Sequence, residues 1–304
     1  MGTPEFAIES LGRILTSSHQ LDAVVTAPDR PAGRGKKLKS SAVKEFALSN
    51  NIKVLQPPNL KDSGFLNELR NFNADLFVVV AFRMLPEIVW SMPKLGTINL
   101  HASLLPNYRG AAPINWAIIN GEKTTGVSTF FIEKEIDTGK IIQNKTVQID
   151  ELDNVGTLHN KLMIQGASLL LNTINDIENN NIQAYQQEDN KPLKKAPKIN
   201  KLTGKIDWSK TNVEINNLIR GLSPYPGAWT LILIDGKKLI LKIFSAIPLS
   251  SKLNSGEIKI INNELHIGCS FGSLNLAEIQ LEGKKRMPAK EFIKGARITN
   301  SKCL

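Results

Sequence analysis

Residues 96–110 read Gly-Thr-Ile-Asn-Leu-His-Ala-Ser-Leu-Leu-Pro-Asn-Tyr-Arg-Gly. Asn99 and His101 alternate with an isoleucine and a leucine, which is the pattern of a β-strand with one apolar and one polar face. The loop that follows places both polar side chains at the carboxyl end of the strand, where ligands bind in open α/β sheets. An amide beside an imidazole can stabilise an oxyanion and move a proton. We therefore expect Asn99 and His101 to be catalytic, although such a pair can also simply satisfy neighbouring loop backbone.

Strands and helices alternate on both sides of this segment. The apolar run 75–82 is typical of a strand covered by helices on both faces of a parallel sheet. This order predicts a doubly wound, Rossmann-like α/β domain over residues 1–189. Its expected strands are 21–26, 52–55, 75–82, 127–132 and 140–149, and its expected helices are 4–17, 41–50, 63–72, 111–120 and 154–180.

The start of this domain is unusual. Thr3 can cap a helix that begins at Pro4, and a Gly-Thr-Pro loop of this kind normally follows a buried strand. Only Met1 precedes it here. Either the true start lies upstream and supplies the first strand, which we expect, or the sheet has lost a central strand and with it some stability.

The last third of the chain has a different pattern. An Asn-rich, Gln-rich and Lys-Pro-rich tract predicts a linker at 190–202. A helix is expected at 213–222, followed by short strands with turn signals between them. Such strands predict a small β-barrel of the oligonucleotide-binding (OB-like) type over residues 203–304. The expected strands are 229–234, 239–244, 257–261, 265–269 and 274–281.

Charge is distributed unevenly. Residues 1–190 contain 18 Lys and Arg against 20 Asp and Glu, a net charge of −2, whereas residues 191–304 contain 20 against 8, a net charge of +12. A strongly basic domain joined to a near-neutral one favours a polyanionic partner such as a nucleic acid. The alternative is a surface that is basic for solubility alone.

Composition excludes several other classes. The 304 residues are 41% hydrophobic and 22% charged, and no apolar run approaches the ~20 residues of a membrane span. Cys269 and Cys303 are too few and too unpatterned for a disulfide framework or a zinc site. We expect a cytoplasmic protein that needs neither a metal nor a membrane.

A basic loop follows the expected strand 21–26. Its prolines and glycines exclude regular structure, and its spacing matches neither a P-loop nor a dinucleotide-binding fingerprint. A flexible basic loop could bind the end of a nucleic acid and become ordered on contact. Its cations are Arg30, Arg34, Lys36, Lys37 and Lys39.

Asp137-Thr-Gly139 is a further candidate motif. It matches the triplet of aspartic proteases, but those enzymes need two such aspartates and this chain has one triplet. A capping aspartate in a tight turn is a second interpretation. If the carboxylate reaches His101, it would orient the imidazole and relay protons through a water. The two residues lie 36 positions apart, so spacing alone does not establish that contact.

Together, Asn99, His101, Ser103-Leu-Leu-Pro106, Tyr108-Arg-Gly110 and Asp137-Thr-Gly139 resemble the signature of the folate-dependent formyltransferases. The resemblance implies that the formyl donor is 10-formyltetrahydrofolate, that no metal is needed, and that the catalytic residues are Asn99, His101 and Asp137. It also implies folate contacts from two loops. The residues concerned are Phe82, Met84, Ser103, Leu104, Leu105 and Pro106, although members of the family often have Tyr-Gly where this chain has Phe82-Arg83.

Within that family the chain is similar to members that act on the methionyl initiator tRNA. Segments 2–7, 28–37, 206–209 and 224–229 carry this closer resemblance. It implies a monomer that binds tRNA through the basic loop and through Lys284, Lys285 and Arg286. Two alternatives remain: a sugar-nucleotide N-formyltransferase, or a non-catalytic tRNA-binding protein on the same scaffold.

Overall fold

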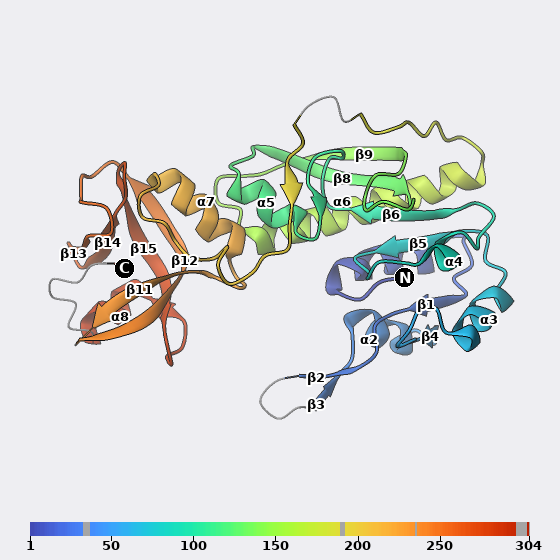
Figure 1. The fold of residues 1–304 in the computed structure, drawn as a ribbon, viewed down its shortest axis with the longest axis horizontal. Coiled ribbons are helices and arrows are strands. Elements are labelled where there is room, and N and C mark those ends of the chain that lie inside the picture. Colours follow the sequence, from blue (N-terminus) through green and yellow to red (C-terminus); the bar gives the residue numbers. More distant parts are fainter. Residues whose placement is uncertain (33–36, 189–191, 235, 296–302, 304) are drawn as a thin grey trace. The chain divides into compact units, whose positions relative to one another are not determined.

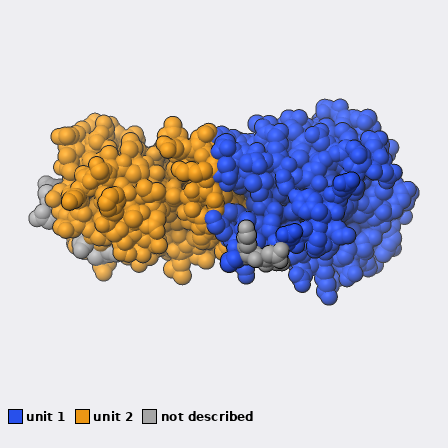
Figure 2. All heavy atoms as spheres, turned by 90° about the horizontal axis from the view of Figure 1, so that it is seen from above, with its two compact units in different colours: residues 1–110, 124–148, 159–195 blue, residues 111–123, 149–158, 196–304 orange. Residues whose placement is uncertain are grey.

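The computed structural model describes residues 1–32, 37–188, 192–234, 236–295 and 303. The chain forms two compact units, which Figure 2 colours separately. The first unit consists of residues 1–110, 124–148 and 159–195, and the second of residues 111–123, 149–158 and 196–304. Two short segments that precede residue 159 therefore belong to the second unit.

The first unit is an α/β structure (Figure 1). Its main sheet has the strand order β5-β6-β8-β9, in which β5 and β6 are parallel and β8 and β9 are antiparallel to their neighbours. A parallel pair, β1-β4, lies apart from that sheet. The elements are η1 (Glu5–Ala7), α1 (Ile8–Leu15), β1 (Ala23–Val25), β2 (Arg30–Ala32), β3 (Lys37–Lys39), α2 (Ala42–Ser49), β4 (Lys53–Leu55), α3 (Ser63–Asn71), β5 (Phe77–Val80), α4 (Glu87–Trp90), β6 (Thr97–His101), β7 (Arg109–Gly110), β8 (Thr124–Phe131), β9 (Ile141–Gln148) and α6 (Val155–Glu178), whose first turn belongs to the second unit.

Strand β6 has the two faces that its sequence predicts. Ile98 and Leu100 are buried. A Cβ atom on Gly166 of α6 would lie 2.9 Å from Leu100, so the glycine lets the helix approach this face of the sheet closely. The alternate residues, Asn99 and His101, lie on the other face. Packing of one face against α6 therefore leaves the polar face for the site.

The basic loop differs from its prediction. Residues 30–32 and 37–39 form the antiparallel pair β2-β3, with Arg30 opposite Lys39. The expectation that prolines and glycines exclude regular structure here was wrong. A two-stranded ribbon has a free edge on each strand, where Pro31 needs no hydrogen-bond donor. The tip, with Arg34 and Lys36, lies outside the described residues.

The first two residues of the chain occupy the position of a strand. Gly2 forms a parallel bridge with Val80 of β5, and its amide donates to the carbonyl of Val25 in β1 over 3.0 Å. Met1 and Gly2 thus join the β1-β4 pair to the main sheet at a single point.

The second unit contains a curled antiparallel sheet that forms a half-barrel (Figure 1). The strand order is β11-β12-β15-β14-β13, and β16 pairs with β15. A register shift after Ile243 interrupts the β12-β15 ladder, as a bulge does when it bends a long strand. Helix α7 is held by a capping box of Thr211 and Glu214. The elements are α5 (Pro113–Ile119), α7 (Asn212–Leu222), β11 (Ala228–Ile234), β12 (Lys237–Leu249), β13 (Ile258–Ile261), β14 (Glu264–Gly268), β15 (Ser273–Leu281), β16 (Met287–Pro288) and α8 (Ala289–Gly295), and the short β10 (Lys195–Ala196) lies where the two units meet in the sequence.

Candidate active site

The imidazole of His101 is buried and held by backbone. Its Nε2 lies 2.9 Å from the carbonyl oxygen of Tyr108. Because a carbonyl oxygen only accepts hydrogen bonds, Nε2 must carry the proton of this bond. The other ring nitrogen, Nδ1, lies 3.8 Å from Oδ2 of Asp137. The structure therefore brings together the imidazole and the carboxylate that spacing alone could not connect.

Asp137 is fixed by the turn that carries it. Its backbone is left-handed, with φ +57°, and its Oδ2 accepts a hydrogen bond of 2.9 Å from the amide of Gly110. At Gly139 a Cβ atom would lie 1.8 Å from the carbonyl oxygen of Phe131, so only glycine fits there. The Asp-Thr-Gly triplet thus combines a carboxylate that faces His101 with the close backbone packing that this placement requires.

Gln187 is a residue that the sequence reasoning missed. Its Oε1 accepts from Nε and Nη2 of Arg109 at 3.0 and 2.7 Å, and its Nε2 donates to the carbonyls of Asp137 and Gly139 at 2.9 and 2.8 Å. The side chain is 7% exposed. Gln187 lies in the Asn-rich and Gln-rich tract next to the predicted linker. The composition of that tract gives no sign of these contacts. One amide therefore ties the Asp137 turn to the segment that follows Tyr108.

Asn99 is half-buried, two residues before His101 and on the same face of β6. Its side-chain amide makes no hydrogen bond to any residue within the described ranges. A partly buried amide costs free energy unless it finds a partner. Asn99 is therefore available to donate to a bound group beside the imidazole.

The loop after β6 is held by its own hydroxyl groups. Ser103 is buried and donates to the carbonyl of Asn107 over 2.7 Å, whereas Ser128 donates to the carbonyl of Ser103 and accepts from the amide of Leu105. Leu105 is buried and Pro106 is half-buried. These bonds fix the loop, and the hydroxyl of Ser103 is already used within it.

Leu104 packs inward from the same loop. A Cβ atom on Gly126 would lie 2.4 Å from its Cδ2, so the leucine side chain covers this glycine of β8. The close approach shows that the loop rests on the sheet beside the polar face of β6.

The loop after β5 is anchored by Arg83. Its guanidinium donates to the carbonyls of Pro57 and Pro58 and stacks on the ring of Phe82 at 5.6 Å. Burial lowers the pKa of Arg83 from its usual value. Phe82 is half-buried and Met84 is 69% exposed. Arginine thus takes a structural role at the position where the family often has glycine.

Five of the predicted basic residues are exposed, on elements of both units. Arg30 and Lys39 are exposed on β2 and β3, and Lys37 lies in β3. Lys284, Lys285 and Arg286 are exposed on the connection from β15 to β16. Arg286 also forms an ion pair with Glu278 and lies 4.1 Å above the ring of Phe244.

No group of three or more His, Cys, Asp or Glu side chains in the described residues is arranged to hold a metal ion. In the same part of the chain, no helix has both the length and the apolar character to cross a membrane.

Comparisons with known proteins cover nearly the whole chain. Residues 1–174 match the family described as "Formyl transferase", and residues 198–297 match "Formyl transferase, C-terminal domain". A methionyl-tRNA formyltransferase of Flavobacterium johnsoniae is 53% identical over 297 residues, which are 97% of this chain and 94% of the relative. One of Bacteroides thetaiotaomicron is 46% identical over 312 residues, covering 99% of this chain and 95% of the relative.

Solved structures agree with this fold. A crystal structure of WlaRD, a sugar 3N-formyltransferase in the presence of dTDP and 5-N-formyl-THF, superposes with a TM-score of 0.67 at 25% identity, covering 93% of this chain and 97% of that one. HypX from Aquifex aeolicus in complex with tetrahydrofolic acid has a TM-score of 0.60 at 20% identity, over 82% of this chain and 44% of that one. The second likeness concerns the fold alone. With both domain families matched and relatives near 50% identity over almost its full length, this chain belongs to the formyltransferase family.

Proposed function

We propose that this protein transfers the formyl group of 10-formyltetrahydrofolate to the α-amino group of methionyl initiator tRNA. The observation that carries this proposal is the 53% identity to a methionyl-tRNA formyltransferase over 97% of the chain, through both the site and the basic C-terminal part. The residues present at the site also suit this reaction chemically. Asn99, His101 and Asp137 are an amide, an imidazole and a carboxylate grouped at the end of β6.

In this reaction the amine nitrogen bonds to the formyl carbon, the bond from that carbon to the donor nitrogen breaks, and a proton passes from the amine to the donor nitrogen. Asn99 would donate to the formyl oxygen as negative charge develops on it. A donor of this kind typically contributes roughly 10²- to 10³-fold in rate. His101, when protonated, would place positive charge beside the same oxygen.

Asp137 and the backbone would control the proton on His101. Nε2 is committed to the carbonyl of Tyr108, so Nδ1 is the nitrogen that can exchange a proton. The 3.8 Å from Nδ1 to Asp137 exceeds a hydrogen bond, and such contacts commonly tighten when the substrate is bound or act through a water. Asp137 would thereby orient the imidazole and stabilise its charged form.

We propose that the two loops beside this group hold the folate. Half-buried Leu104, Pro106 and Phe82 offer apolar surface for a ring, and exposed Met84 can cover it. Buried Leu105 would contribute by packing the loop in place. Ser103 would contribute through the loop that it holds together, because its hydroxyl is bonded to Asn107.

We also propose that tRNA binds through the basic residues named above: Arg30, Arg34, Lys36, Lys37, Lys39, Lys284, Lys285 and Arg286. The net charge of +12 in residues 191–304 supports this assignment. Accordingly, residues 1–189 would form the catalytic domain, 190–202 a linker and 203–304 the tRNA-binding domain, acting as a monomer in the cytoplasm.

The test is a formyl-transfer assay with 10-formyltetrahydrofolate and two acceptors, methionyl initiator tRNA and an amino-sugar nucleotide. Transfer to the tRNA is expected. Transfer to the sugar nucleotide alone would replace this proposal with the alternative that the likeness to the sugar 3N-formyltransferase favours. Transfer to neither acceptor by a protein that is folded by circular dichroism would leave a non-catalytic tRNA-binding protein.

A further inference from the structure

The charge of Arg83 has no role in the site described above. Arg83 follows β5, which runs parallel to β6, so it lies at the same edge of the sheet as the proposed catalytic group. A guanidinium has five N–H groups. Two of those on Arg83 donate to the carbonyls of Pro57 and Pro58, and the one on Nε is buried without a partner. The terminal nitrogens therefore keep N–H groups for a further acceptor.

Arg83 lies beside the base of the β2-β3 pair. Pro57, which accepts from Arg83, directly follows Gln56. The Nε2 of Gln56 donates over 2.9 Å to Oδ1 of Asp29, and Asp29 directly precedes Arg30, the first residue of β2. All of these residues belong to the first unit. This line of contacts joins the loop that carries Arg83 to the start of the basic pair.

The positive charge at this place is not neutralised by the residues that the structure describes. Among their ion pairs, none includes Arg83, Arg30 or Lys39. The neighbouring acid, Asp29, is occupied by Lys44, whose Nζ lies 2.6 Å from its Oδ2. Burial and the charge of Arg30 lower the pKa of Arg83, so both act against its charged form. A bound anion would stabilise that form.

The guanidinium of Arg83 points away from β6. Strand β6 pairs with one edge of β5, and Gly2 joins the β1-β4 pair to the other edge. The two prolines that hold the guanidinium follow β4. The guanidinium thus faces the side of the β2-β3 pair and not the loop Ser103–Pro106, which we propose for the folate. An anion that meets both Arg83 and Arg30 would approach from the side of the basic pair.

We propose that Arg83, together with Arg30, binds a phosphate group near the 3′ end of the methionyl tRNA. This inference rests on the function proposed above. The amino acid is esterified to the 3′ end of a tRNA, so the last phosphates of the strand must come near the sheet edge at which the amine is formylated. The donors and the charge of a guanidinium match phosphate oxygens. Such contacts position the strand without reading its sequence.

The test compares Arg83→Gln with Arg83→Lys. Glutamine can still donate to one of the two carbonyls but carries no charge, whereas lysine keeps the charge. In filter binding without the folate donor, Arg83→Gln should raise the Kd for methionyl tRNA roughly 5- to 10-fold, and Arg83→Lys should raise it much less. The slope of log Kd against log salt should fall by about 1 in the glutamine variant. The matched control is Arg70→Gln, which removes an exposed cation of α3 and should leave the Kd unchanged.

A modified tRNA locates the contact. Methylphosphonate linkages at the 3′ end replace charged phosphates with uncharged groups of similar size. This tRNA should bind the unmodified chain more weakly than the natural tRNA does. The loss should be smaller in Arg83→Gln, because that variant no longer has the charge that the phosphate meets.

Three results would overturn the proposal. An equal loss from methylphosphonate in the unmodified chain and in Arg83→Gln would place the contact elsewhere. Equal rises in Kd for Arg83→Gln and Arg83→Lys would show that Arg83 only anchors its loop. A rise in the KM for 10-formyltetrahydrofolate, without a rise in the Kd for tRNA, would assign Arg83 to a carboxylate of the donor.

The unmodified chain separates this proposal from the proposed function. If it formylates methionyl tRNA and one of these three results is found, only the role of Arg83 is wrong. If it binds no tRNA at all, both proposals are wrong.

Discussion

His101 is oriented by two acceptors that belong to different loops. The carbonyl of Tyr108 accepts a hydrogen bond from Nε2, and the carboxylate of Asp137 faces Nδ1. The carboxylate is itself held by the amide of Gly110. A short chain of contacts thus fixes which ring nitrogen can take part in chemistry, and each of its links can be tested.

Asp137→Asn should lower kcat for formyl transfer by roughly 10²-fold, because an amide still accepts from Gly110 but no longer stabilises a protonated imidazole. The measurement is steady-state transfer to methionyl-tRNA. Glu135→Gln, an exposed residue of the same turn, is the matched control and should retain activity. Full activity of the Asp137 variant would remove the carboxylate from the mechanism.

Gln187→Ala should lower kcat by roughly 10-fold while the KM for tRNA stays constant, because the Asp137 turn and Arg109 lose the amide that joins them. The free energy of unfolding should fall by about 2 kcal/mol, since the buried carbonyls of Asp137 and Gly139 lose a donor. Its neighbour Gln186 is exposed, and Gln186→Ala should change neither quantity. A KM effect without a kcat effect would show that Gln187 acts on tRNA binding instead.

The sequence could predict the residues that we propose as catalytic but not Gln187, which we propose positions them. Asn99 and His101 were recognisable because alternation along a strand fixes the face on which they lie. Asp137 required the family resemblance, since its contact with His101 depends on how the strands pair. Gln187 acts through one side chain folded back from an irregular segment, and neither periodicity nor composition records such a contact.

At the level of elements, most helices and strands formed where hydrophobic periodicity predicts them. Helix α2 begins after Ser41, which accepts from the amide of Lys44, and α3 begins after Asp62 in the same way. The β2-β3 pair was not predicted, because the prolines and glycines in and around it indicate a loop. The short helix α4 was not predicted either, since four residues are too few to show a helical periodicity.

The β2-β3 pair places Arg30 opposite Lys39, and two exposed cations opposite each other disfavour the pair unless an anion lies near them. Arg30→Ala combined with Lys39→Ala should therefore raise the KM for tRNA several-fold and leave kcat at saturating tRNA unchanged. The matched control is Lys53→Ala, which removes an exposed cation of β4 that pairs with Glu68 of α3. An unchanged KM in the double variant would exclude these two residues from the tRNA interface.

Burial lowers the pKa of the Met1 amine from 8.0 to about 5, which predicts a pH dependence of stability. Above pH 8 the amine is neutral in both the folded and the unfolded chain, but between pH 8 and about 5 only the unfolded chain binds a proton. The free energy of unfolding should therefore fall as pH falls through this range, by roughly 4 kcal/mol at most.

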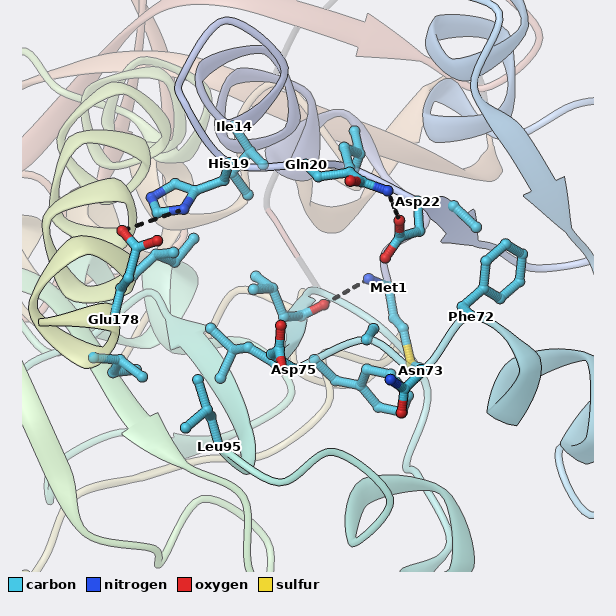
Figure 3. A pocket seen from close by; sticks show the side chains of 18 of the residues that line it. Met1, Ile14, His19, Gln20, Asp22, Phe72, Asn73, Asp75, Leu95 and Glu178 are labelled. Atoms are coloured by element: carbon cyan, nitrogen blue, oxygen red, sulfur yellow. Dashed lines mark hydrogen bonds and ion pairs between the residues drawn. The ribbon is translucent and has the colours of Figure 1, made fainter. Parts of the chain in front are cut away.

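The side chains of His19, Asp22, Asp75 and Glu178 line the same cavity as Met1 (Figure 3), so the comparison must isolate the amine. Urea unfolding of the chain and of its Nα-acetylated form from pH 5 to 9 does this, with mass spectrometry to confirm that Met1 is intact. In the acetylated chain, the free energy of unfolding should not show the fall with decreasing pH that the amine causes. Parallel curves for the two forms would show that the amine carries no such penalty.

At the level of the whole molecule, charge separates the proposed tRNA enzyme from its alternative. The net charge is −2 in residues 1–190 and +12 in residues 191–304, an asymmetry that a small substrate does not require. A tRNA releases many counterions on binding, whereas a sugar nucleotide carries few charges and releases few. The salt dependence of the KM for the acceptor therefore distinguishes a tRNA from a sugar nucleotide.

The KM for methionyl-tRNA should rise roughly 10-fold or more between 50 and 200 mM salt, and Lys284→Ala with Lys285→Ala should flatten this dependence by removing two exposed cations. The KM for the folate donor should change much less over the same range, which serves as the internal control. Melting temperatures measured at both salt concentrations show whether the fold itself responds. A KM for tRNA that stays flat in the unmodified chain would mean that the basic C-terminal part does not bind the tRNA, and its charge would then serve solubility alone.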